Sequence, residues 1–93
     1  MDPILNFING RFVPAEGGET LDTVNPATGE TLTTLPRSTS ADVHIATKAA
    51  VDAGPMWSAT TMDERIHWLE RLADALEDDA ETVASLESMD TGK

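Results

Sequence analysis

Few residues in this chain of 93 could carry out chemistry. There is no cysteine, and the two histidines, His44 and His67, have neither a cysteine nor a second histidine at the spacing of zinc ligands. A surface or helix-capping role is the simpler interpretation of both. Asp74, Asp78 and Asp79 lack the alternating oxygen ligands and the glycine of a calcium loop, so we interpret them as a solvated helix face.

The Gly92-Lys93 pair raises the question of a phosphate-binding loop. Such a loop also needs a glycine five positions before the Gly-Lys pair, where this chain has Glu87. No local motif indicates a Ser-His-Asp arrangement. Trp57 and Trp68 lie near expected helix ends, where we interpret them as packing anchors rather than ligand platforms.

The charge balance excludes several classes of partner. The chain has 17 acidic and 6 basic residues, a formal net charge of -11. Because phosphate binding needs Lys and Arg on one face, we expect neither nucleic acid nor an anionic membrane as a partner. Solubility, a salty cytoplasm or a surface that faces a basic partner would each explain the acidity.

The length allows one small domain with little core. A domain of this size buries roughly 60–65% of the surface that its unfolded chain exposes, and no disulfide can add stability here. No apolar run is long enough to span a bilayer, and the N-terminus lacks the basic and apolar regions of a signal peptide. The absence of cysteine fits a reducing compartment, and we expect a cytoplasmic protein.

Two β-hairpins are predicted in the first 38 residues. Asn9-Gly10 is a strong signal for a type I′ turn, with arms at residues 5–8 and 11–13. A second turn is predicted at residues 25–29, where Pro26 presets φ and Gly29 can adopt a positive φ. It would join two antiparallel strands, which are marginal unless they pack against another element.

A change to helical patterning near Thr39 predicts the first helix. Thr39 and Asp42 resemble a capping box, with Asp in place of the usual Glu. Small apolar residues recur on one face at spacings of three and four, namely Val43, Ala46, Ala50 and Ala53. We expect Gly54-Pro55 to end this helix.

A stronger amphipathic pattern follows. Thr61 and Glu64 form a predicted capping box. Apolar residues then define what we call the 66–83 stripe, which consists of Ile66, Leu69, Ala73, Leu76, Ala80 and Val83. A second cap signal at Asp78, with Glu81 as its third helical residue, predicts a break and hence helices at about 62–78 and 79–89. Gly92 is the expected stop signal.

In their order and spacing, these segments resemble the N-terminal part of the aldehyde dehydrogenase superfamily. The matching stretches are "FINGRFV" at 7–13, "VNPATGE" at 24–30, "ADVHIATKAA" at 41–50, Trp57, "ERIHWLERLADALE" at 64–77 and "LESMDTGK" at 86–93. The resemblance covers about the whole chain. It implies an α/β fold in which residues 1–93 are the N-terminal portion of the NAD(P)-binding domain, with two hairpins and two or three flanking helices.

The resemblance also implies a reaction that these residues cannot perform alone. Family members oxidise an aldehyde to a carboxylate with NAD or NADP, through a cysteine thiohemiacetal and a thioester that a glutamate-activated water hydrolyses. None of those catalytic or cofactor-contacting residues falls in the matching segment, and a chain without cysteine has no such nucleophile. We therefore expect no catalytic and no cofactor-binding residue here.

One modest site is implied within this segment. Many family members bind a monovalent cation through a backbone oxygen before the "NP" pair and the Asp of the "LDxGK" region. The matching positions are the Val24 carbonyl and the Asp90 carboxylate, with Thr23 as a further candidate, for Na⁺ or K⁺. Oxygen ligands suit a hard cation. The alternative is that Asp90 caps a helix end or pairs with Lys93.

Three hypotheses for the chain follow. The first is an N-terminal, non-catalytic fragment of a dehydrogenase, whose full-length relatives are dimers or tetramers. The second is a free-standing module that pairs with the remainder of a split enzyme or associates with itself through the 66–83 stripe. The third and weakest is an acidic decoy for a basic surface, which would need its carboxylates on one face, whereas they are spread around both helices.

Overall fold

The first hairpin forms around the turn that the sequence predicts. In the computed structural model, which describes residues 1–93, β1 (Asn6–Ile8) pairs antiparallel with β2 (Arg11–Val13). Asn9 has φ 53° and Gly10 has φ 76°, as a type I′ turn requires. Phe7 and Phe12 face each other in register, with ring centroids 5.0 Å apart.

The second hairpin forms a separate two-stranded sheet. β3 (Thr20–Val24) pairs antiparallel with β4 (Thr31–Pro36), and an irregularity interrupts the register between Thr23 and Val24. The predicted turn is confirmed: Gly29 has φ 77°, and the Asn25 side chain accepts a 2.9 Å hydrogen bond from the Ala27 N–H. The N-terminal segment runs beside β4, where the Ile4 N–H donates to the Thr34 carbonyl at 2.9 Å.

Helix α1 (Ser40–Ser58) begins at the predicted cap and ends later than predicted. Thr39 and Asp42 make both bonds of the capping box. The expectation that Gly54-Pro55 would end the helix is wrong. Proline removes only one backbone N–H, Gly54 keeps a right-handed conformation, and the Ala59 N–H still donates to the Pro55 carbonyl at 3.1 Å. The helix therefore continues for about one more turn.

The predicted break after α2 (Met62–Asp78) is confirmed, and α3 (Ala80–Thr91) follows it. Two details of capping are wrong. Thr61 accepts from the Glu64 N–H at 3.1 Å, but the Glu64 side chain does not return the bond. The N-cap of α3 is Asp79 rather than Asp78, and its side chain makes no capping bond, because its φ of -111° and ψ of 17° are not those of an extended cap.

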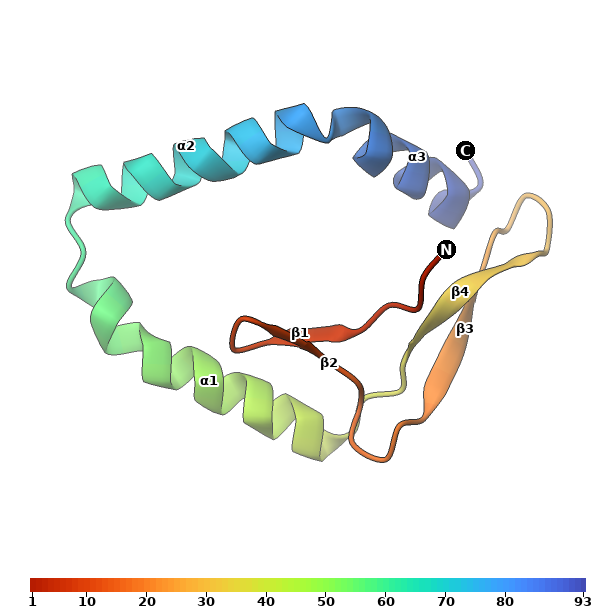
Figure 1. Ribbon diagram of the computed structural model, residues 1–93, viewed down its shortest axis with the longest axis horizontal. Coiled ribbons are helices and arrows are strands. Elements are labelled where there is room, and N and C mark those ends of the chain that lie inside the picture. The colour runs from red at the N-terminus through yellow and green to blue at the C-terminus, as the bar shows by residue number, and fades with distance from the viewer.

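The elements form an open arch with almost no core. Figure 1 shows α1 along one side, α2 and α3 along the other, and the two hairpins between and beyond them. Only Ala15, Thr33 and Asp42 are buried. The radius of gyration is 16.7 Å, whereas a compact chain of this length has about 12 Å. The 66–83 stripe is left uncovered, with Leu69 62% and Leu76 54% exposed.

No helix is both long and apolar enough to cross a membrane.

Candidate functional site

The predicted cation ligands come from two segments that meet at one corner of the arch. The end of α3 returns to the β3–β4 hairpin (Figure 1), where the Thr23 hydroxyl donates to the Asp90 carboxylate at 3.5 Å across 67 residues of sequence. Val24 follows Thr23 at the irregularity in the strand pairing, a place where a ladder is locally interrupted. Two of the three predicted residues, Thr23 and Asp90, are thus in contact.

The same corner contains Gly92, the one glycine of the chain at which an added Cβ would meet another residue. Gly92 ends α3 with φ 77°, and its N–H donates to the Ser88 carbonyl at 2.9 Å. A Cβ at Gly92 would lie 2.9 Å from Pro26 Cγ and 3.3 Å from the Ala27 nitrogen. The "NPATG" turn is therefore the surface on which the end of α3 lies. The sequence predicted the turn and the helix stop separately, without their contact.

An open cavity of about 480 Å³ adjoins this corner. It lies between the N-terminal segment, the second hairpin and α3. Its lining combines five apolar residues with Thr23 and two carboxylates, and consists of Met1, Ile4, Thr23, Leu32, Val83, Leu86, Glu87 and Asp90. Val83 and Leu86 thus face the interior of the arch.

The structure brings together no group of three or more His, Cys, Asp and Glu side chains that could hold a metal ion. His44 lies on α1 and His67 lies on α2, and both are exposed. The one ion pair joins Lys48 and Asp52 at 2.6 Å, so the alternative of an Asp90–Lys93 pair is not formed. The oxygen donors at the corner fit a hard monovalent cation better than zinc.

A second polar cluster ties the first loop to α1. The Asp42 carboxylate accepts from the Thr39 N–H at 2.7 Å and from the Glu16 N–H at 2.9 Å, and its residue is 6% exposed. These backbone hydrogen bonds, with that of Thr39 the larger, hold the pKa of Asp42 below its ordinary value. The sequence predicted the capping role of Asp42 but gave no signal for its bond to Glu16.

The family model and the sequence relatives that match this chain all belong to one family. The Aldehyde dehydrogenase family matches residues 12–93. The chain is 41% identical over 90 residues to the hydroxyisobutyraldehyde dehydrogenase of Mycolicibacterium austroafricanum, covering 97% of this chain and 18% of that protein. It is also 41% identical over 92 residues to aldehyde dehydrogenase [NAD(P)+] 1 of Saccharomyces cerevisiae, covering 98% and 18%.

Solved structures agree with the sequence relatives. HpcC from Thermus thermophilus superposes with a TM-score of 0.96 at 42% identity, over 98% of this chain and 18% of that one. PnpE in complex with nicotinamide adenine dinucleotide superposes with a TM-score of 0.92 at 43% identity, over 99% and 19%. The two hairpins and three helices thus match the N-terminal part of α/β structures of this kind, and the predicted fold class is confirmed.

Proposed function

Because this chain belongs to the aldehyde dehydrogenase family, we propose that it forms the N-terminal portion of the NAD(P)-binding domain of an enzyme that oxidises an aldehyde to a carboxylate. It spans about 18% of the length of the curated relatives it matches. The chain contains no cysteine. The nucleophile of the proposed reaction therefore comes from sequence outside these residues, and residues 1–93 act as scaffold.

The observation that carries this proposal is the uncovered interior of the arch. The chain exposes 7451 Å², about 2,200 Å² more than a compact protein of 10.0 kDa. A stable interface of ordinary size buries only about 800 Å² on each partner. The excess exposed area is thus more than twice what one partner buries in such an interface. This favours cover by a large part of the same folded domain.

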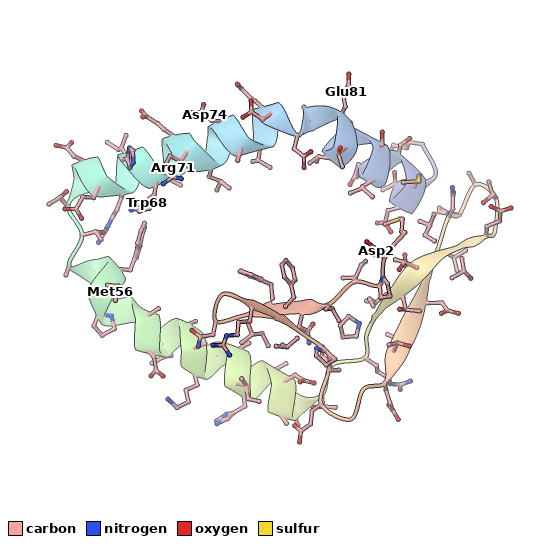
Figure 2. All side chains as sticks on the ribbon, viewed as in Figure 1. Asp2, Met56, Trp68, Arg71, Asp74 and Glu81 are labelled. Atoms are coloured by element: carbon pink, nitrogen blue, oxygen red, sulfur yellow. The ribbon has the colours of Figure 1, made fainter.

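The distribution of polar residues supports cover from the interior side. Figure 2 shows Glu81 projecting outward from the arch, and Asp74 lies one heptad earlier on the same side of the helical arm. Val83 on α3 lines the interior cavity, and Leu76 on α2 belongs to the same uncovered 66–83 stripe. We propose that the remainder of the dehydrogenase packs on this largely apolar interior, and that the outer side with Asp74 and Glu81 faces water.

The proposal is tested by capture of the native protein with an antibody against the outer side of α2, followed by an assay of NAD(P)H formation with a panel of aldehydes. We expect aldehyde-dependent reduction of NAD or NADP by the captured protein from the cytoplasmic fraction, and none by the 93-residue chain. Captured protein that reduces neither cofactor with any aldehyde would contradict the proposal.

We further propose that Thr23, the Val24 carbonyl and Asp90 contribute to a site for Na⁺ or K⁺. The 3.5 Å contact of Thr23 with Asp90 supports this assignment, and further ligands would come from sequence outside the chain. Titration with KCl or NaCl against a choline chloride control should raise the melting temperature of the native protein. Asp90→Asn should abolish that rise and Asp79→Asn should not. An equal rise in both variants would contradict the assignment.

The exposed 66–83 stripe also supports the alternative of a free-standing module that pairs with a separate chain or with a second copy of itself. A stable native species of 10 kDa that co-purifies with a larger dehydrogenase chain, or that elutes as a dimer, would favour this alternative.

A further inference from the structure

Arg65, in the first turn of α2, lies beside the elbow between α1 and α2 (residues 59–61) and has no acidic partner. We propose that Arg65 is a positioning residue that sets the angle between the two helices by capping the carboxyl end of α1 from α2. The contacts that carry this inference lie within residues 57–65. It therefore concerns the chain itself and does not depend on the proposed enzymatic role.

Arg65 reaches back across the elbow with two of its nitrogens. Its Nη2 donates to the carbonyl oxygens of Trp57 at 3.1 Å and Ser58 at 3.2 Å, and its Nε donates to the Thr60 hydroxyl at 2.9 Å. The Thr60 hydroxyl in turn donates to the Trp57 carbonyl at 2.6 Å. The guanidinium also lies 5.5 Å from the centre of the Trp57 ring. One side chain thus contacts the last turn of α1 and the connecting segment together.

The end of α1 needs such a partner. The last turns of a helix leave carbonyl groups without intrahelical donors, and the helix dipole places partial negative charge there. The last turn of α1 has no basic residue of its own. The planar guanidinium offers several donors in a fixed geometry, which a lysine ammonium does not. The Trp57 carbonyl already accepts from the Thr60 N–H at 3.1 Å and from the Thr60 hydroxyl. Arg65 therefore supplies from the next helix the positive charge that the last turn of α1 lacks and the donor for the Ser58 carbonyl.

Burial distinguishes Arg65 from every other residue of α2. It is the only one of the 17 that is not exposed, although this helix carries most of the 66–83 stripe. No carboxylate is paired with it, since the one ion pair of the structure joins Lys48 and Asp52. The apolar residues of α2 do not contact α1 closely enough to bury themselves. The polar contacts of Arg65 are therefore the interaction that fixes how the two helices diverge.

Arg71 provides a matched control on the same helix. Its guanidinium lies 5.0 Å from the centre of the Trp68 ring, so it makes the same kind of cation–π contact. Both residues of that pair lie within α2, and Arg71 makes no hydrogen bond to α1. Arg71→Met thus removes a charge and an aromatic contact without touching the elbow.

The test measures the angle rather than stability alone. Nitroxide labels at His44→Cys and Asp74→Cys of the native protein, with any cysteine outside residues 1–93 replaced by serine, report the distance between α1 and α2; residues 1–93 themselves have no cysteine to remove. Labelled chain is diluted with unlabelled chain so that only distances within one molecule contribute to pulsed electron spin resonance. Circular dichroism measures the helical content of each variant.

We expect a single narrow distance distribution in the parent and in Arg71→Met, and a clearly broader one in Arg65→Met at unchanged helical content. Arg65→Lys and Thr60→Val, which each remove part of the contact, should give intermediate widths. A distribution in Arg65→Met as narrow as that of the parent would overturn the proposal. So would equal broadening in Arg71→Met, or a parent distribution already as broad as that of Arg65→Met.

Discussion

Gly92 provides the sharpest test of how the arch closes, because two separate physical effects oppose any side chain there. Its φ of 77° lies in the left-handed region, which costs an L-residue about 1–2 kcal/mol. A Cβ would also lie 2.9 Å from Pro26 Cγ, which requires the helix end or the turn to move. Overpacking of this kind costs about 1–3 kcal/mol. The smaller entropy of the unfolded alanine chain offsets part of the strain and leaves about 1 kcal/mol of it. We therefore expect Gly92→Ala to lower the free energy of unfolding by about 2–4 kcal/mol in total.

Two other glycines separate the two effects. Gly29 has the same φ of 77° but no atom within 4 Å of where a Cβ would lie, so Gly29→Ala should show the strain alone, about 1 kcal/mol after the smaller entropy of the unfolded alanine chain is counted. Gly54 lies within α1 with a right-handed backbone and open space around it. Gly54→Ala should therefore stabilise the protein by about 0.5–1 kcal/mol.

The assay is urea unfolding of the native protein and its three variants, followed by tryptophan fluorescence. Amide hydrogen exchange at Ala27 adds a local measurement, since α3 covers this turn only while the contact with Gly92 holds. If Gly92→Ala costs no more than Gly29→Ala, the end of α3 does not lie on the turn, which would contradict the close contact of Gly92 with Pro26.

Three further predictions concern single side chains. Because the pKa of Asp42 is lowered in the folded protein, its carboxylate stabilises the fold above the ordinary carboxyl pKa, and this contribution should be lost as the pH falls below about 3.8. Asp42→Asn should therefore have a lower free energy of unfolding at pH 7, and that free energy should fall less steeply in acid. Thr61→Ala should lower the free energy of unfolding by about 1 kcal/mol and Asp79→Ala should leave it nearly unchanged, because only Thr61 makes a capping bond; equal losses in urea titrations would contradict this. Leu76→Asp should lower the free energy of unfolding of the native protein by at least about 2 kcal/mol if the interior is covered. Glu81→Ser, on the outer side, should change that free energy by no more than about 0.5 kcal/mol. A small effect of Leu76→Asp would mean that Leu76 faces water.

The features that sequence predicts here are those that neighbouring residues decide. Asn9-Gly10 fixes its turn because both residues tolerate a positive φ, and the Thr39–Asp42 box fixes where α1 starts. The break before Ala80 is likewise local, as is the apolar periodicity of α2. The end of α1 is local too, yet the prediction there was wrong, because a proline near a helix end removes only one hydrogen bond.

Contacts between distant segments had no such signal. The Asp42 bond to the Glu16 N–H joins residues 26 apart, and nothing in the "AEGG" loop indicates it. Gly92 was predicted as a helix stop, but its second requirement, the approach to Pro26, depends on how the whole arch curves. Arg65 lies in a stretch whose periodicity directs attention to the leucines. The family resemblance named Thr23 and Asp90 as candidate cation ligands without predicting their contact, and the cation site with the Val24 carbonyl stays a prediction.

The central claim, that these residues are part of a longer aldehyde dehydrogenase, is tested most directly by the intact mass of the native gene product. Mass spectrometry of protein captured from its own cells should find a species several times heavier than 10.0 kDa that contains residues 1–93. A stable native species of 10 kDa, with no longer form and no dehydrogenase chain bound to it, would contradict the account.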